Sequence, residues 1–258
     1  MKPASEGSAR SGAVQSVERA FDLLELLTDA GGSQGLTQLS EASGLPLPTI
    51  HRLMATLTQA GYVRRESSRR YTLGPRLVRI GEAASRVFGT WATPSLRHLV
   101  DLSGESANLA MLDGDGIVYV AQAPSPHAMR MFTEPGRRVM AHCTGVGKAI
   151  LAQMPADDVR TLLERTGMPA LTPRTITDPG SLIAQLAEVR DRGYAVDDGE
   201  QEVGVRCVAM AVPEAPGRVA ISVSGPQARI SYEDIGRIVP ILTQIRSELE
   251  SALAGNGA

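Results

Sequence analysis

A glycine-rich stretch that ends in a lysine is the segment whose residue types most directly suggest chemistry. Residues 142–148 read HCTGVGK, and a glycine loop before a lysine is typical of phosphate binding. The P-loop pattern is absent, however, because it requires glycine where His142 stands and serine or threonine where Ala149 stands. A glycine turn at a helix start remains, and its free N–H groups can hold a carboxylate. A simple capped turn is an equally good interpretation.

Two cysteines, Cys143 and Cys207, raise the alternative of a cysteine-dependent small-molecule enzyme, since His142 could meet either sulfur. Neither cysteine has a local nucleophile signature, and isolated cysteines are more often buried side chains. Their spacing does not suit zinc, so we expect no metal and no cofactor. The acidic residues at 197–200 are too close together for an acid–base pair, which favours a solvated loop. We therefore expect no enzyme.

A third group of residues has side chains of the types that contact DNA. Thr49, His51 and Arg52 fall on the outward side of a predicted helix, and arginine and threonine side chains read base edges. The segment after this helix carries four arginines that suit phosphate contacts: Arg64, Arg65, Arg69 and Arg70. An ordinary exposed helix face and a solvated ribbon are the alternatives, but both features together favour double-stranded DNA as a partner.

Residues 36–73 supply the elements that would position the DNA-facing side chains. Thr37 is placed to cap a short helix that Gly44 ends, and a turn at Pro46 leads into a second helix. The apolar residues of the second helix share one face: Ile50, Leu53, Met54 and Leu57. Beyond Gly61, an arginine-rich hairpin is predicted. Two helices joined by a short turn and followed by a basic ribbon indicate a winged helix-turn-helix.

The flanking segments complete a DNA-binding domain at residues 14–75. Residues 1–13 are small and polar, which predicts a disordered arm. Ser16 can cap a supporting helix that runs to about Ala30. Its expected buried face holds Val17, Ala20, Phe21, Leu24 and Leu27. Residues 76–90 predict a linker helix whose apolar stripe needs a partner surface, such as a second copy of the chain.

The rear of the chain, residues 91–254, mixes short strands with helices. Strands are predicted at 106–112, 117–122, 129–132, 194–196, 205–212 and 218–224. Helices are predicted at 96–102, 144–154, 157–166, 180–192 and 232–253. Since no regular β-α-β repeat occurs, we expect an α+β fold class with a mostly antiparallel sheet.

Composition and charge agree with a globular protein of two domains. The 258 residues are 43% hydrophobic and 21% charged, which is ordinary for such proteins. Residues 1–80 hold 10 basic against 7 acidic residues, whereas the remainder is acidic, so the front alone has the charge that suits nucleic acid. No apolar run reaches the ~18 residues of a membrane span, and no signal peptide is visible. A cytoplasmic location without a membrane partner is expected.

Several longer stretches together resemble the IclR family of bacterial transcription regulators, from about Val14 to Ala252. They read GLPLPTIHRLMATL, AGYVRR, YTLGPRL, SGESANLAML, MRMFTEPGRRVMAHCTGVGKAILA, RGYAVDDGEQEVGVRCVAMAV and AISVSGP. The resemblance implies an N-terminal winged helix-turn-helix, a linker helix used in dimerisation and a C-terminal effector domain of GAF-like α/β fold. Family members are typically dimers or dimers of dimers on near-palindromic operators. A sequence-specific DNA-binding regulator, and specifically a repressor, is therefore expected.

The same resemblance implies effector contacts in the rear domain. The matching positions are Gly145, Val146, Asp197, Cys207, Ser222 and Ser224, with Met131 and Val139 as apolar lining. Helix-start N–H groups, hydroxyls, a thiol and an aspartate suit a carboxylate with an adjacent carbonyl, hydroxyl or amide. The likeness is greatest to actinobacterial members, including allantoin-pathway regulators. A small organic acid or ureide is thus the expected effector, with glyoxylate and allantoate as candidates; an oligomeric sensor that does not bind DNA is the remaining alternative.

Overall fold

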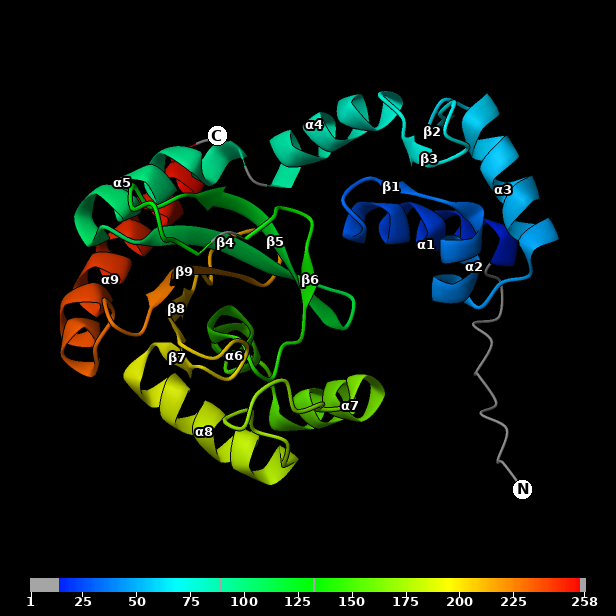
Figure 1. Cartoon of the computed structure of the whole chain (residues 1–258). Coiled ribbons are helices and arrows are strands. Elements are labelled where there is room, and N and C mark those ends of the chain that lie inside the picture. The colour runs from blue at the N-terminus through cyan, green and yellow to red at the C-terminus, as the bar shows by residue number, and fades with distance from the viewer. Residues whose placement is uncertain (1–13, 89, 132, 256–258) are drawn as a thin grey trace, which may run out of the picture. The chain divides into compact units, whose positions relative to one another are not determined.

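The computed structural model of the chain describes residues 14–88, 90–131 and 133–255 (Figure 1). The predicted disordered arm, residues 1–13, lies outside the described residues. The chain divides between Ala84 and Ser85 into two compact units, which are described one at a time.

The first unit has the predicted pair of helices and hairpin. Its elements are α1 (Gln15–Asp29), β1 (Ser33–Gln34), α2 (Leu36–Ser43), α3 (Leu47–Gln59), β2 (Val63–Arg65) and β3 (Tyr71–Leu73). The strands form an antiparallel sheet in the order β1-β3-β2. Strand β1 was not predicted, because two residues give no alternation of polar and apolar side chains. Its register pairs Ser33 with Thr72, so the hairpin is tied to the end of α1.

Two helices begin at residues other than the predicted ones. Helix α2 starts after Gly35, whose N–H donates to the side-chain oxygen of Gln38 at 3.1 Å, so Thr37 is not its cap. Helix α1 starts after Val14, and Ser16 lies within its first turn. A capping hydroxyl contributes only about 1 kcal/mol, which is too little to fix a helix start against the packing of the rest of the unit.

The buried face of α1 also differs from the prediction. Leu27 is completely buried as predicted, and Ala20 and Leu24 are partly buried against the same core. Leu23, which was not predicted, is also completely buried, whereas Val17 and Phe21, which were expected in the core, are 50% and 63% exposed. Helix α1 packs against α2, α3 and β3. Because these neighbours cover one side of the helix, only the Leu23 side enters the core of the unit.

Helix α4 (Arg76–Phe88) is the predicted linker helix. Its apolar side chains Val78, Ile80 and Val87 are 61%, 50% and 69% exposed. A helix with this much exposed apolar surface is typical of an element that packs against another chain.

The second unit is built on a six-stranded antiparallel sheet in the order β6-β5-β4-β9-β8-β7. Its strands are β4 (Ser106–Asp113), β5 (Gly116–Ala123), β6 (Arg138–Val139), β7 (Ala195–Asp198), β8 (Val205–Ala211) and β9 (Val219–Pro226). Its helices are the 3-10 helix η1 (Thr90–Ala92), α5 (Thr93–Ser103), α6 (Gly145–Leu151), α7 (Ala156–Thr166), α8 (Pro179–Arg192) and α9 (Tyr232–Gly255). The expected α+β class with an antiparallel sheet is confirmed.

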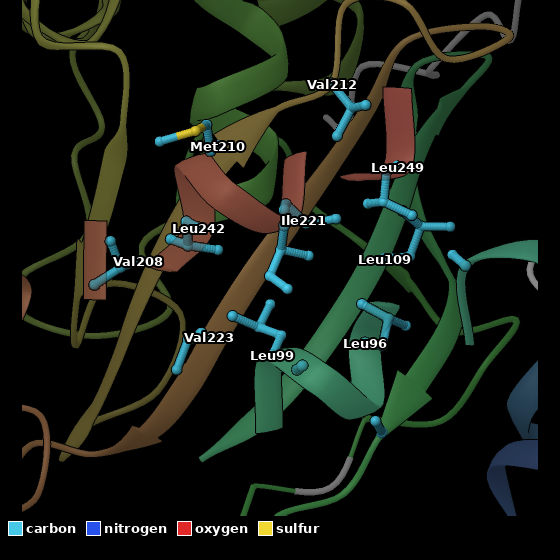
Figure 2. Packing of buried hydrophobic residues seen from close by; sticks show 14 of the residues in the cluster. Leu96, Leu99, Leu109, Val208, Met210, Val212, Ile221, Val223, Leu242 and Leu249 are labelled. Atoms are coloured by element: carbon cyan, nitrogen blue, oxygen red, sulfur yellow. The ribbon is translucent and has the colours of Figure 1, made fainter. Parts of the chain in front are cut away.

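Helices cover both faces of this sheet. Helices α5 and α9 pack on one face against residues that include Leu109, Ile221 and Val223 (Figure 2). Helix α6 packs on the other face, and α8 packs against α6. Since successive strand residues point to opposite faces, β9 sends Ile221 and Val223 into the first core and Ser222 and Ser224 toward α6.

The predicted strand at 129–132 is wrong. The described residues Met129–Met131 form no strand, and the edge of the sheet beside β5 is β6 instead. A turn places the N–H of Gly136 on the carbonyl oxygen of Tyr119 at 2.7 Å, and β6 follows directly. The alternation of apolar and polar side chains at Met129–Met131 is typical of a strand, but residues 136–139 already pair with the edge of β5.

Candidate functional site

Helix α3 presents the residues that were predicted to face DNA. Pro46 is its N-cap and Pro48 lies in its first turn, where a missing N–H costs no hydrogen bond. The opposite side of the helix holds the buried residues Ile50, Met54 and Leu57. His51 and Arg52 are exposed, and Thr49 is half-buried. The exposed side is thus available to a partner, as a recognition helix requires.

The hairpin that follows α3 is the wing. All four predicted arginines are exposed: Arg64, Arg65, Arg69 and Arg70. Arg70 is partly committed, because it donates to the carbonyl oxygen of Ser33 at 2.6 Å and to the Ser33 hydroxyl at 3.1 Å. The Arg65 guanidinium lies 5.8 Å from the centre of the Tyr71 ring. Arg69 occupies the turn with φ of +64°. The wing therefore carries a basic surface held on a three-stranded sheet.

A small cavity in the second unit gathers most of the predicted effector residues. Six of the eight line it: Met131, Val139, Gly145, Asp197, Cys207 and Ser224. The other two, Val146 and Ser222, are completely buried and are not part of the lining. The cavity offers about 50 Å³ to the centre of a water-sized molecule, which suits a ligand of a few heavy atoms.

Strand register brings the polar lining residues together. Asp197 in β7 is paired with Cys207 in β8, and Cys207 is paired with Ser224 in β9, so the three residues form a row on one face. The side-chain amide of Asn108 donates to the hydroxyls of Ser224 at 3.3 Å and Ser222 at 3.4 Å. Asn108 and Ser222 therefore hold this row from within the sheet.

The glycines at the start of α6 are required by close packing. A Cβ on Gly145 would lie 2.8 Å from the Cys207 sulfur, and a Cβ on Gly147 would lie 2.2 Å from the carbonyl oxygen of Ala141. The Thr144 hydroxyl accepts from the Gly147 N–H at 3.2 Å and so caps the helix. The helix has seven residues, Gly145–Leu151, and ends before the predicted residue 154. Gly145 therefore serves the contact between helix and sheet, and Gly147 serves the contact between the helix and the loop before it.

Six further residues line the cavity that the sequence did not indicate: Tyr119, Thr133, Arg137, Gln201, Glu202 and Val205. A bulge between β4 and β5 pairs Leu109 with Ala121 and Ala110 with Tyr119, which turns the Tyr119 ring toward the α6 side. Simple alternation along β5 could not place it. Thr133 and Arg137 lie in a loop, where side-chain periodicity carries no signal.

Asp197 lines the cavity, and its carboxyl has a pKa close to neutral pH. It is 4% exposed, and burial raises the pKa of its carboxyl to about 7. The backbone N–H groups of Glu200 and Gln201 oppose that shift by donating to Asp197 Oδ1 at 2.7 and 3.4 Å. The carboxyl can therefore act as a hydrogen-bond donor or as an acceptor within the physiological pH range.

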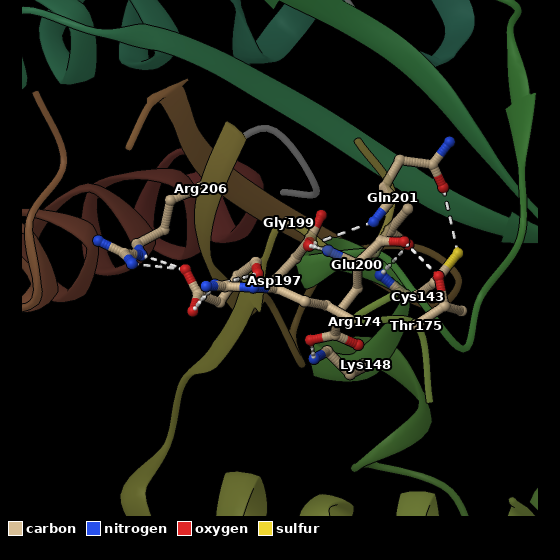
Figure 3. A network of polar contacts seen from close by, with 12 residues as sticks. Cys143, Lys148, Arg174, Thr175, Asp197, Gly199, Glu200, Gln201 and Arg206 are labelled. Atoms are coloured by element: carbon tan, nitrogen blue, oxygen red, sulfur yellow. Dashed lines mark hydrogen bonds and ion pairs between the residues drawn. The ribbon is translucent and has the colours of Figure 1, made fainter. Parts of the chain in front are cut away.

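A buried ion pair lies beside the cavity (Figure 3). Lys148 of α6 is completely buried and is paired with Glu200, which is 5% exposed. Burial raises the pKa of Glu200, and the Lys148 charge opposes the rise. Asp198 forms ion pairs with Arg206 and Arg174. The expectation of a solvated loop at 197–200 is therefore wrong, because the turn after β7 folds inward onto α6.

The two thiols are not arranged for catalysis. Burial raises the pKa of Cys143 to about 12 and that of Cys207 to about 11, so both remain protonated near neutral pH. The Cys143 thiol donates to Gln201 Oε1 at 3.1 Å, while His142 Nε2 lies 3.2 Å from the Pro169 carbonyl oxygen. Within the described part of the chain, no cluster of histidine, cysteine and acidic residues could hold a metal ion.

A winged helix-turn-helix followed by a unit with a small polar cavity defines a ligand-responsive DNA-binding regulator. Comparison with known protein families supports this class. Residues 16–67 match the IclR helix-turn-helix domain, and residues 87–250 match the bacterial transcriptional regulator IclR C-terminal domain. The chain belongs to the IclR family of bacterial transcriptional regulators.

Individual relatives cover nearly the whole chain. The transcriptional repressor IclR of Escherichia coli K12 is 35% identical over 98% of this chain and 95% of its own length. The crystal structure of an IclR transcriptional regulator from Alicyclobacillus acidocaldarius is 29% identical, with a TM-score of 0.81 over 93% of this chain and 99% of the other. An IclR homologue from Microbacterium hydrocarbonoxydans, solved in complex with 4-hydroxybenzoate, shares the fold at 21% identity and a TM-score of 0.79, over 93% of this chain and 99% of the other.

The matching family models and the repressor from Escherichia coli are those of transcriptional regulators and not of enzymes, which favours the regulator prediction over the cysteine-enzyme alternative. The described residues include no helix that is long and apolar enough to cross a membrane. The chain has a DNA-binding unit at its front and an effector-binding domain behind it.

Proposed function

We propose that this protein is a repressor that binds a near-palindromic operator and is controlled by a small carboxylate or ureide. The observation that carries the proposal is the row Asp197, Cys207 and Ser224 along a small cavity, in a chain whose front unit is a helix-turn-helix. The effector site would be the rear cavity, and the operator contacts would come from α3 and the wing.

In the DNA-binding unit, Thr49, His51 and Arg52 would contact base edges from α3. The arginines of the wing would contact phosphates, which position the protein without reading sequence: Arg64, Arg65, Arg69 and Arg70. Arg70 would also position the wing, since its bonds to Ser33 join β3 to β1. Residues 14–75 would form this domain, which residues 76–90 link to residues 91–254.

In the effector domain, the row of three polar groups would bind the polar part of the ligand, with Met131 and Val139 against its apolar part. Gly145 would offer the ligand its backbone N–H at the start of α6, and Val146 and Ser222 would support the wall from behind. The narrow cavity favours an acid as small as glyoxylate over the longer allantoate. The 4-hydroxybenzoate bound by a homologue of the same fold is also a carboxylate.

A homodimer, or a dimer of dimers, would complete the assembly. The exposed apolar residues of α4, Val78, Ile80 and Val87, would be covered by a second copy, and a two-fold pair of wings would suit a near-palindromic operator. An effector can change operator affinity only if it favours one conformation of this assembly over another.

The test combines DNA binding with ligand binding on the full-length protein. Fluorescence anisotropy would follow binding to the DNA upstream of the protein's own gene, with and without millimolar glyoxylate or allantoate. We expect nanomolar to micromolar specific binding that at least one of these compounds changes, together with a raised melting temperature. Binding no tighter than to unrelated DNA would contradict the operator role and favour an oligomeric sensor.

A further inference from the structure

Arg137 is the one cation among the described residues that line the cavity. Its backbone is fixed, because its N–H donates to the Glu134 carbonyl oxygen at 3.0 Å and its own carbonyl oxygen accepts from the Tyr119 N–H at 3.1 Å. Its side chain is exposed. Across the described chain, no hydrogen bond or ion pair occupies the Arg137 guanidinium, which leaves its donors available to a ligand.

The next residue, Arg138, has the same chemistry but a different environment. Its guanidinium donates to the Asp113 carboxylate at 2.6 Å and to the Asp113 carbonyl oxygen at 2.7 Å. It is not part of the cavity lining. The sequence thus places two adjacent arginines at the edge strand β6, one in an ion pair and one at the cavity without a partner.

An anionic ligand in this cavity needs a counter-charge. Asp197 and Glu202 also line the cavity, and each would repel a carboxylate when ionised. Helix α6 has seven residues, and Thr144 accepts from its Gly147 N–H, so its start offers the partial charge of backbone N–H groups and no formal positive charge. Lys148 is buried and committed to Glu200. The positive charge that remains free at this site belongs to Arg137.

We propose that the Arg137 guanidinium is an anion subsite that binds the carboxylate of the effector. This inference rests on the function proposed above. Guanidinium and carboxylate form charge-assisted hydrogen bonds in matching planar geometry. The remainder of the ligand would then face the hydroxyl of Ser224, the thiol of Cys207 and the carboxyl of Asp197. The ligand class is a small monocarboxylate that carries a carbonyl, hydroxyl or amide group close to its acid group.

The experiment compares Arg137→Gln with Arg138→Gln in the full-length protein. Isothermal titration calorimetry would use glyoxylate, pyruvate and allantoate as acids, with pyruvamide and allantoin as uncharged counterparts. We expect Arg137→Gln to weaken the binding of an acid roughly ten- to a hundredfold and to leave uncharged compounds unaffected. Arg138→Gln removes the same charge one residue away and should leave acid binding within about twofold of wild type, by the same reasoning.

Salt supplies a second readout. Raising KCl from about 50 to 500 mM screens exposed charges, so acid binding by the wild-type protein should weaken, whereas the residual binding by Arg137→Gln should change less. The melting temperature of each variant without ligand confirms folding, since both side chains are exposed. Equal acid affinity of wild type and Arg137→Gln overturns this inference and leaves the proposed function standing. Failure of every acid to bind the wild-type protein overturns both.

Discussion

Gly145, the first residue of α6, lies so close to Cys207 of β8 that a Cβ at Gly145 would stand 2.8 Å from the Cys207 sulfur. This contact seats the start of the helix on the polar row of the sheet. It sets one wall of the effector cavity, because both residues line it. Steric fit between a helix and a sheet therefore explains the first glycine of the GVGK sequence.

Replacing Gly145 with alanine should force these elements apart. We expect a loss of about 1–3 kcal/mol in the free energy of unfolding, as for other overpacked cores, measured by urea denaturation. Cys207→Ala removes the sulfur that the new methyl group would meet, so Gly145→Ala should cost less in the Cys207→Ala background. Strictly additive effects of the two substitutions would contradict a direct steric conflict.

Asp197 should make stability depend on pH. Its pKa is raised from 3.8 to about 7 in the folded protein, so between these values the folded state binds more protons than the unfolded state. Its contribution is present in full below pH 3.8 and is lost as pH rises toward and through 7. Asp197→Asn mimics the protonated form, so wild-type stability should fall relative to this variant from pH 4 to 7. Urea denaturation across that range would reveal the difference, and parallel pH profiles would refute the assignment.

The buried pair of Lys148 and Glu200 should be sensitive to the loss of one partner. Lys148→Met leaves the Glu200 carboxylate buried without its counter-charge, which typically costs about 3–5 kcal/mol. Adding Glu200→Gln removes the isolated charge, so the double variant should recover part of the loss. Chemical denaturation of the two single variants and the double variant measures this coupling. A double variant less stable than Lys148→Met would show that the pair is not coupled in this way.

Arg52 should contribute to operator sequence recognition. Arg52→Ala should lower affinity for the specific DNA by roughly 1–3 kcal/mol while the affinity for unrelated DNA falls less. Arg160 of α7 is exposed and lies in the other unit, so Arg160→Ala is a matched control that should bind like wild type. Anisotropy measurements with both DNAs decide the matter, and an unchanged specificity ratio would exclude Arg52 from base readout.

Arg64 should act through phosphate contacts. Arg64→Ala should weaken binding to specific and unrelated DNA alike and lower the slope of log affinity against log salt by about one. Affinities at several KCl concentrations, with circular dichroism to confirm folding, provide the measurement. A change in sequence preference without a change in slope would place Arg64 on the bases instead.

Local sequence patterns determined much of this protein. The spacing of Ile50, Met54 and Leu57 predicts the buried side of α3 because the 3.6-residue period belongs to the helix itself. The winged helix-turn-helix, the linker helix and the antiparallel class of the second sheet follow from similar patterns. The family resemblance placed Asp197, Cys207 and Ser224 together, and the strand register brings them into one row.

Only the tertiary structure decided which side chains enter the cavity and which charges are paired. The bulge that turns Tyr119, the burial of Lys148 against Glu200 and the pairing of β6 with β5 each depend on contacts between separate elements. Arg137 and Arg138 are the same residue type in adjacent positions, yet one meets Asp113 and the other meets the cavity. Composition and periodicity cannot distinguish them, because the difference comes from long-range packing around each side chain.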